Sequence, residues 1–167
     1  LLEGAPILIH TVRKFVAARA VSEIYVAVRP EDMDPLHQQL QEEGYAKPVC
    51  LVEGGRSRQV SVRNCLAQVP SGTELVCVHD AVRPFVTVSQ IDEICEEASK
   101  SEAVILAIPP VDTIKQVDRT VIRSTLMRER IVLAQTPQVF KFSLLKNAFE
   151  QAERDGFVAT DEAGLVE

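Results

Sequence analysis

One loop in this sequence has the residue types that bind anions. Gly54 and Gly55 follow a short apolar run and precede Ser57, where helical periodicity begins. Glycines let a ligand approach the backbone closely, and a helix N-terminus flanked by Arg56 and Arg58 favours negative charge. A strand-to-helix turn with solvated arginines explains the same residues, and taken alone the segment favours that simpler interpretation. We call residues 54–58 the glycine loop.

A second loop, residues 79–84 (His-Asp-Ala-Val-Arg-Pro), directly follows the apolar run 75–78. Asp80 could hold Mg²⁺ or orient a polar group, and Arg83 has a planar fork that matches phosphate oxygens. An ion pair between Asp80 and Arg83 that only ties the loop down explains them equally well. We interpret His79 as a packed residue, because attack by an anionic phosphate needs little proton abstraction. We call this segment the aspartate loop.

Three later segments supply further hydroxyls and cations. Residues 112–115 and 135–138 flank a polar stretch, and both could be ordinary turn chemistry. Thr160 would by default cap a helix, unless its segment folds back to the site. Four arginines make the polar stretch basic: Arg119, Arg123, Arg128 and Arg130. They could simply be solvated, or they could reach toward an anionic substrate in a neighbouring subunit.

Strand-like and helix-like segments alternate along the chain and position these loops. Apolar runs predict strands at 24–28, 49–52, 75–78 and 103–108. Helical periodicity predicts helices at 6–19, 32–43, from 57 onward, at 89–101 and at 143–154. We therefore predict an α/β fold with a mostly parallel sheet, helices on both faces and right-handed crossovers. Ligands bind beyond the carboxyl ends of strands in such sheets, where both loops lie.

Residues 112–132 break this alternation, because polar and apolar side chains alternate there without a helical stripe. That pattern predicts a β-arm that projects from the sheet. The chain then returns through 132–140 to the last helix. We find no linker or internal repeat, so we predict one domain over residues 1–167, with residues 112–132 as its arm.

Composition excludes several functional classes. Charged residues make up 25% of the chain and hydrophobic residues 46%, with no apolar run near the length of a membrane span, which favours a soluble globular protein without a membrane role. A net charge of −6 without a continuous basic tract argues against nucleic acid as the partner. The scattered cysteines are typical of core thiols in a reducing compartment, and no structural metal is predicted: Cys50, Cys65, Cys77 and Cys95.

Taken together and in order, five segments resemble the 2-C-methyl-D-erythritol 4-phosphate cytidylyltransferase family over nearly the whole chain. They are residues 54–58 with 61–62, 79–84, 112–115, 136–138 and 160–163. The aspartate loop is the most specific of them. The resemblance implies a Rossmann-like nucleotidyltransferase fold, a cytoplasmic homodimer joined through the arm, and Mg²⁺-dependent attack of a substrate phosphate on the α-phosphorus of CTP, with pyrophosphate leaving.

The resemblance also implies roles for individual residues. Asp80, as metal ligand, and Arg128, which orients the acceptor from the partner subunit, are the catalytic assignments. The implied nucleotide contacts are Gly55, Arg56, Ser61, Asp80 and Ala81. The implied contacts to the methylerythritol phosphate are Arg83, Thr113, Thr136 and Thr160. Catalysis of this kind depends chiefly on positioning and charge neutralisation.

This sequence departs from the family pattern at three places. The family's opening strand and glycine-rich loop, with an Arg and a Lys, and its closing Asn-Ile-Lys segment have no match here, so we expect a domain incomplete at both ends and little activity from these residues alone. Val60 stands where an Asp commonly precedes the serine. Two alternatives remain open, a ribitol 5-phosphate cytidylyltransferase and a non-catalytic nucleotide-binding or dimerisation module.

Overall fold

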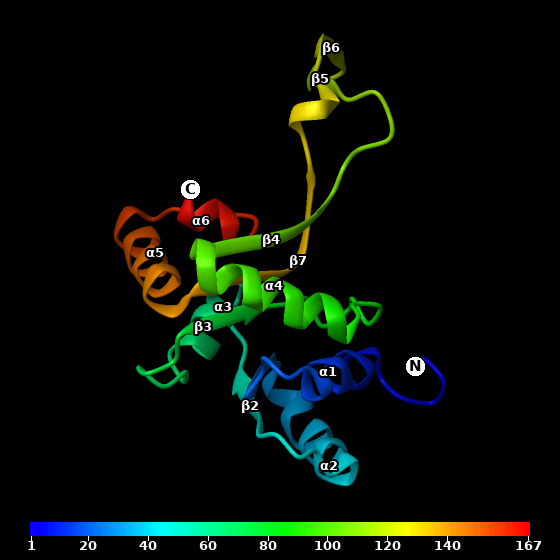
Figure 1. Ribbon diagram of the computed structural model, residues 1–167, viewed down its shortest axis with the longest axis vertical. Coiled ribbons are helices and arrows are strands. Elements are labelled where there is room, and N and C mark those ends of the chain that lie inside the picture. The colour runs from blue at the N-terminus through cyan, green and yellow to red at the C-terminus, as the bar shows by residue number, and fades with distance from the viewer.

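Helices and strands alternate along the chain in the computed structural model, which describes residues 1–167 (Figure 1). The helices are α1 (Ile7–Ala17), α2 (Met33–Glu43), α3 (Arg58–Leu66), α4 (Val88–Ser101), α5 (Phe142–Asp155) and α6 (Ala163–Val166), with short 3-10 helices at Pro30–Asp32 and Arg128–Arg130. The strands are β1 (Ile24–Val28), β2 (Val49–Glu53), β3 (Leu75–Val78), β4 (Ala103–Ile108), β5 (Lys115–Asp118), β6 (Val121–Thr125) and β7 (Leu133–Lys141). The predicted α/β class is confirmed.

Local signals in the sequence account for the helix ends nearest the site. The Ser57 hydroxyl accepts a hydrogen bond from the Val60 amide and caps α3, as its position before the helical run predicts. Thr87 and Gln90 form a capping box at the start of α4. α2 ends at Gly44, which adopts the left-handed conformation at φ 60°. These caps fix where the loops between strands and helices begin.

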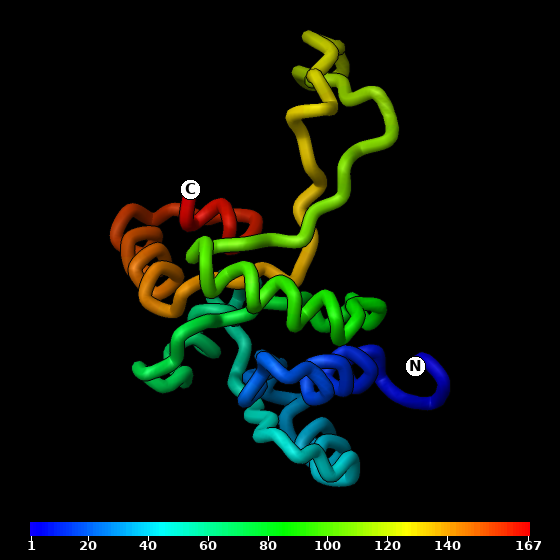
Figure 2. The backbone as a smooth tube through the Cα atoms, viewed as in Figure 1, coloured from blue at the N-terminus to red at the C-terminus, as the bar shows by residue number.

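The strand pairing is mixed, which corrects the prediction of a mostly parallel sheet. β1 and β2 pair in parallel, from Ile24 opposite Val49 to Val28 opposite Glu53. β7 lies between β3 and β4 and runs antiparallel to both. The reason is visible in Figure 2, where the chain leaves β4, runs out through the arm and returns from the opposite direction as β7.

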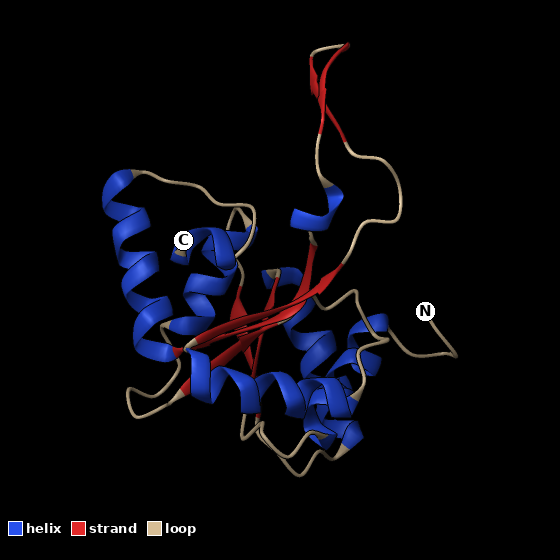
Figure 3. Cartoon of the chain, turned by 45° about the horizontal axis from the view of Figure 1, so that its top comes forward, coloured by secondary structure: helices blue, strands red, loops and turns tan.

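Helices cover both faces of the three-stranded sheet, as predicted (Figure 3). Successive residues of β7 point to opposite faces: Val139 packs against Ile94 of α4, whereas Phe140 packs against Leu145 of α5. All four of these side chains are buried. The strands that carry the aspartate loop and residues 135–138 are therefore held rigidly from both sides.

A second layer is formed by β1 and β2, with α1 and α2 packed on them through Ile9, Val12, Val26 and Leu36. Cys50 of β2 is exposed, which corrects the prediction that all four cysteines are core thiols, because it alternates along the strand with Val49 and Leu51, which pack on the cluster of α1 and α2. No hydrogen-bonded ladder joins β1 to β3. No helix has the length and apolar content needed to cross a membrane.

The arm (residues 112–132) projects from this body as β5 and β6, which pair antiparallel from Lys115 opposite Thr125 to Asp118 opposite Val121 (Figures 1 and 2). Every residue of β5 is exposed. The arm carries exposed apolar side chains, namely Val117, Val121, Ile122 and Met127.

Candidate active site

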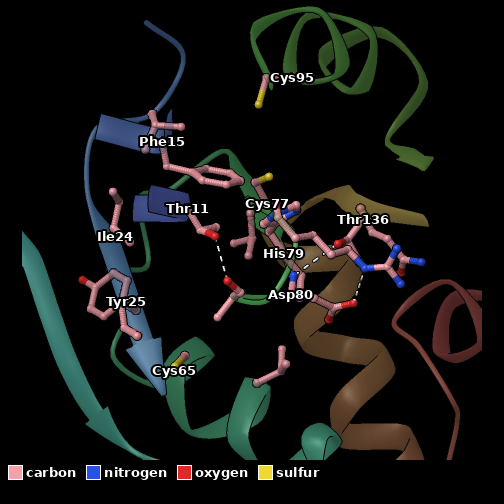
Figure 4. A pocket seen from close by; sticks show the side chains of 18 of the residues that line it. Thr11, Phe15, Ile24, Tyr25, Cys65, Cys77, His79, Asp80, Cys95 and Thr136 are labelled. Carbon is pink, nitrogen blue, oxygen red and sulfur yellow. Dashed lines mark hydrogen bonds and ion pairs between the residues drawn. The ribbon is translucent and has the colours of Figure 1, made fainter. Parts of the chain in front are cut away.

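A cavity of about 1340 Å³ lies between β1 and β3 and extends to the aspartate loop (Figure 4). The strands supply its apolar walls, and its polar rim comes from four segments distant in sequence. Six of the predicted site residues line it: Ser61, Asp80, Ala81, Arg83, Thr136 and Thr160. Gly55, Arg56, Thr113 and Arg128 do not. The cavity therefore brings together most of the predicted residues of the body, whereas Gly55 and Arg56 of the glycine loop and both residues of the arm lie outside its lining.

Asp80 is the centre of the polar rim, because both of its carboxylate oxygens accept hydrogen bonds from guanidinium groups. Arg58 Nε lies 3.1 Å from Oδ1, and Arg83 Nε lies 2.9 Å from Oδ2. Burial by itself raises the pKa of Asp80, but the bonds from Arg83 and Arg58 outweigh it and hold the pKa below its usual value. Asp80 therefore stays ionised, and the internal pair with Arg83 exists.

Arg83 is also held from its far side, where Nη1 donates to the Gln135 side-chain oxygen. Its side chain is still 42% exposed, so the guanidinium is oriented without being enclosed. A guanidinium fixed by two neighbours and open to the cavity is well suited to an anion, because the entropy cost of ordering it has already been met by folding. Its internal ion pair is compatible with this use.

Two further contacts fix the backbone of the aspartate loop. The Asp80 amide donates to Thr136 Oγ1 at 3.2 Å, and Thr11 of α1 donates to the Ala81 carbonyl at 2.7 Å (Figure 4). Thr136 is only 9% exposed, yet it lines the cavity. The loop is thus tied to β7 on one side and to α1 on the other.

His79 is a packed residue, as predicted. Its ring lies 4.9 Å from that of Phe15, and Nε2 is 3.0 Å from the Arg83 carbonyl. Burial lowers its pKa, which favours the neutral imidazole. Nδ1 is buried without a protein partner.

The glycine loop requires glycine for steric reasons. A Cβ on Gly55 would lie 2.1 Å from Val60 Cγ1, and one on Gly54 would lie 3.2 Å from the Val28 carbonyl oxygen. Ser61 Oγ accepts from the Gly55 amide and donates to the Ser57 carbonyl, both at 3.0 Å. Ser61 therefore stabilises the loop, whatever else it contacts.

The segment before α6 folds back to the cavity, so Thr160 and Asp161 line it. This is the condition under which Thr160 is not expected to cap a helix, and it caps none. α6 begins at Ala163, and the carboxylate that reaches its first free amides is Asp161, whose Oδ1 accepts from Gly164 at 3.1 Å. Asp161 Oδ2 in turn accepts from Gln138 of β7 at 2.7 Å.

Sequence reasoning assigned no role to several residues that build this site. Gln138 is 1% exposed and joins β7 to the returning segment through Asp161 and the Ala163 amide. Glu162 is equally buried and pairs with Arg58 at 2.7 Å. A buried amide or carboxylate must have a polar partner, but the sequence does not show which distant residue supplies it.

The arm residues lie apart from the cavity of their own chain. Arg128 Nη1 donates to the Val111 carbonyl at 2.5 Å, and its Nε is 3.6 Å from Glu129. Thr113 is exposed just before β5. Both residues belong to the part of the molecule that projects away from the body in Figure 1.

The donor set for a metal ion is small. No group of three or more His, Cys, Asp or Glu side chains is placed to hold one. Mg²⁺ in proteins that act on phosphates is commonly bound by one or two carboxylates together with substrate oxygens. Of the carboxylates that line the cavity, Asp80 is the one in the aspartate loop, so the cavity fits that arrangement with Asp80 as the protein ligand.

Known proteins with related sequences all point to one family. The family model described as IspD, 2-C-methyl-D-erythritol 4-phosphate cytidylyltransferase, matches residues 1–167. A protein of that name from Solibacter usitatus is 48% identical over 171 residues, which cover 100% of this chain and 70% of that protein. Another from Acidobacterium capsulatum is 50% identical, over 99% of this chain and 72% of that protein.

Solved structures agree with the sequence relatives. A 4-diphosphocytidyl-2C-methyl-D-erythritol synthase from Anaerococcus prevotii superposes with a TM-score of 0.92 at 28% identity, over 99% of this chain and 72% of that one. The 2-C-methyl-D-erythritol 4-phosphate cytidylyltransferase from Thermus thermophilus superposes with a TM-score of 0.82 at 32% identity, over 99% of this chain and 75% of that one. The chain therefore belongs to the IspD family of 2-C-methyl-D-erythritol 4-phosphate cytidylyltransferases.

Proposed function

We propose that this chain carries the cavity in which CMP is transferred from CTP to 2-C-methyl-D-erythritol 4-phosphate, a step of non-mevalonate isoprenoid synthesis. The observation that supports this most directly is the meeting of Asp80, Arg83 and Thr136 with Ser61 and Thr160 on one cavity. These residues come from four separate segments. Family membership over the whole chain supports the substrate pair.

The nucleotide is proposed to bind across the glycine loop and the start of the aspartate loop. Gly55 lets the loop pack closely on Val60, since a side chain there would collide with that residue, and it lies exposed at the start of the loop. Arg56 is exposed and has no ion pair or hydrogen bond within the chain, so it is free for an anion. Ser61 would meet the cytidine end, and Asp80 and Ala81 would lie by the ribose and phosphates.

The acceptor is proposed to bind beside Arg83, Thr136 and Thr160. The oriented Arg83 guanidinium suits its phosphate, and the two threonines offer hydroxyls at the same cavity. Thr113 and Arg128 would complete this site from the arm of a second subunit. The exposed apolar side chains of the arm, and an Arg128 held only by neighbouring residues of the arm and its base, support such a homodimer.

The reaction requires little of the protein beyond positioning and charge. An oxygen of the acceptor phosphate forms a bond to the α-phosphorus of CTP, the bond from that phosphorus to the bridging β-phosphate oxygen breaks, and pyrophosphate leaves. The attacking oxygen is already anionic, so no general base is needed. This agrees with a His79 that is packed on Phe15 and favoured in its neutral form.

Mg²⁺ is proposed as the cofactor, and Asp80 would hold it together with phosphate oxygens of CTP. When bound, it would neutralise charge on the phosphates. We also propose a cytoplasmic location, which the four free cysteines support.

Incubating the full-length protein with radiolabelled CTP, Mg²⁺ and each acceptor in turn tests this function. We expect label in 4-diphosphocytidyl-2-C-methyl-D-erythritol and an equal amount of pyrophosphate. If CMP is transferred to ribitol 5-phosphate alone, ribitol 5-phosphate is the acceptor and methylerythritol phosphate is not. CTP binding without turnover of either acceptor would identify a non-catalytic module and overturn the proposal.

A further inference from the structure

Arg58 joins two carboxylates that come from distant parts of the chain. It is the first residue of α3, and its Nε donates to Asp80 Oδ1 at 3.1 Å while Nη1 donates to Glu162 Oε1 at 2.7 Å. These partners lie 22 and 104 residues away in sequence. One planar guanidinium therefore links the glycine loop, the aspartate loop and the segment before α6.

Glu162 depends on this contact. Its side chain is 1% exposed, its Oε2 has no hydrogen-bond partner, and Arg58 is the only cation paired with it. Burial raises the pKa of Glu162, and the charge and hydrogen bond of Arg58 act in the opposite direction. Because a buried carboxylate holds its counter-ion strongly, Arg58 is anchored at this end.

The other end of Arg58 acts on the site. Asp80 is 25% exposed, and its two oxygens are shared between Arg58 and Arg83. With Arg58 anchored on Glu162, the plane of the Asp80 carboxylate is set by two guanidiniums approaching from different segments. Both contacts of the Arg58 guanidinium go to protein carboxylates. Arg56, two residues earlier, has no such partner within the chain.

We propose that Arg58 is a positioning residue for the proposed transfer reaction, acting through Asp80 and anchored by Glu162. Although Arg58 lines the cavity, its proposed role is to hold Asp80 and not to bind substrate. It sets the orientation of the Asp80 carboxylate toward the nucleotide phosphates and keeps the Thr160 segment in register with it. The inference rests on the proposed function, because the orientation matters only if Asp80 serves CTP.

The rival explanation is that Arg58 only neutralises a buried charge. Three variants separate the two: Arg58→Gln, Glu162→Gln, and both together. Arg58→Gln leaves Glu162 buried without a counter-ion, so both stability and activity should fall. In the double variant no buried charge is left unpaired, so the thermal midpoint should recover most of the loss. Asp80 still lacks its second guanidinium there.

We therefore expect the double variant to keep kcat reduced about tenfold or more, with the KM for CTP changed less than about threefold. Arg63→Gln is the matched control, because Arg63 on the same helix pairs with Glu153 outside the cavity. It should leave kcat unchanged. Arg58→Lys tests whether the planar guanidinium is needed, since it keeps the charge but one ammonium cannot make both contacts in the same geometry.

An active wild type together with a double variant that recovers kcat along with stability would overturn this inference and leave the proposed function intact. Full activity of Arg58→Gln would overturn it as well. A wild type that transfers no CMP to the acceptor would instead overturn the proposed function, and this inference with it.

Discussion

The aspartate loop and the arm both carry arginines assigned to the substrate phosphate, but the two regions hold them very differently. Arg83 contacts the side chains of Asp80 and Gln135 in a packed body. Arg128 lies in the short 3-10 helix after an almost wholly exposed hairpin, where it contacts the Val111 carbonyl and its neighbour Glu129. The aspartate loop is therefore ordered by contacts within its own chain. The arm instead exposes a cation and apolar side chains that do not pack against the body of its own chain.

This contrast indicates how the site is divided. Electrostatic positioning works best where groups are held before the ligand arrives, and the network around Asp80 meets that condition within one chain. The arm cannot, because its contacts are local. A second subunit would bury the apolar face of the arm and bring Arg128 to a partner's cavity. The predictions below test that division, beginning with the region expected to matter most.

Replacing Asp80 with Asn should have the largest effect. The substitution keeps the shape but removes the charge that Arg58 and Arg83 share and that the proposed Mg²⁺ would use. We expect kcat to fall on the order of 10²–10³-fold, measured as pyrophosphate release at saturating CTP. The change in thermal midpoint should be small, since the side chain is partly exposed. Retained activity would contradict a central role for this loop.

Replacing Arg128 with Ala should be next in size. Turnover of the sugar phosphate should fall on the order of 10²-fold, because the acceptor phosphate loses an orienting cation. The dimer should persist in sedimentation, since Arg128 contacts only the arm and its base within its own chain. Equal loss of folding and activity would mean that the residue is structural.

Mixing the Asp80→Asn and Arg128→Ala proteins sharpens this test. If Arg128 serves the partner's cavity, each heterodimer holds one site with both native residues, and activity should reappear on subunit exchange. If Arg128 serves its own chain, no heterodimer contains an intact site, and the mixture should stay as inactive as its components. Crosslinking after mixing would verify that heterodimers had formed.

Placing a charge on the arm tests its surface without touching the body. Ile122 is 60% exposed, so Ile122→Asp should cost the isolated chain little stability. At a dimer interface the buried carboxylate should raise the dissociation constant about tenfold or more, measured by sedimentation equilibrium. The control is Ile7→Asp, an exposed apolar residue at the start of α1. If both substitutions weaken the dimer equally, the arm is not the specific dimer interface.

The sequence predicts the body better than its connections. Periodicity placed three strands at their observed bounds, 24–28, 75–78 and 103–108, because apolar runs reflect burial directly. It missed the direction of β7, which depends on the path of the chain through the arm. It could not decide between a capping and a cavity position for Thr160, because that depends on whether the segment before α6 folds back to the body.

The candidate site follows the same division. Motifs identified the residues that line the cavity, such as Asp80 and Thr136. They did not identify what holds those residues in place. The pairing of Arg58 with Glu162 spans 104 residues, and no local pattern encodes a contact of that separation. Supporting contacts of this kind emerge only when the segments are folded together.

The smallest predicted effect concerns the two carboxylates that Arg58 joins, because their pKa values shift in opposite directions. Burial raises the pKa of Glu162, so its contribution to stability is fully present below the ordinary value of 4.5 and is lost as the pH rises through the folded pKa. The pKa of Asp80 is lowered, so its contribution is present above 3.8 and is lost as the pH falls through its folded pKa.

The two windows do not overlap, which makes the groups separable in a thermal-midpoint series against pH. Glu162→Gln should abolish the gain in stability as the pH falls through the folded pKa of Glu162 toward 4.5 while keeping the loss below 3.8, and Asp80→Asn should do the reverse. Each difference should amount to a few degrees. If both variants flatten the same window, Arg58 couples the carboxylates too tightly for either to titrate alone, and the body site behaves as one charged unit, in contrast to the independent arginines of the arm.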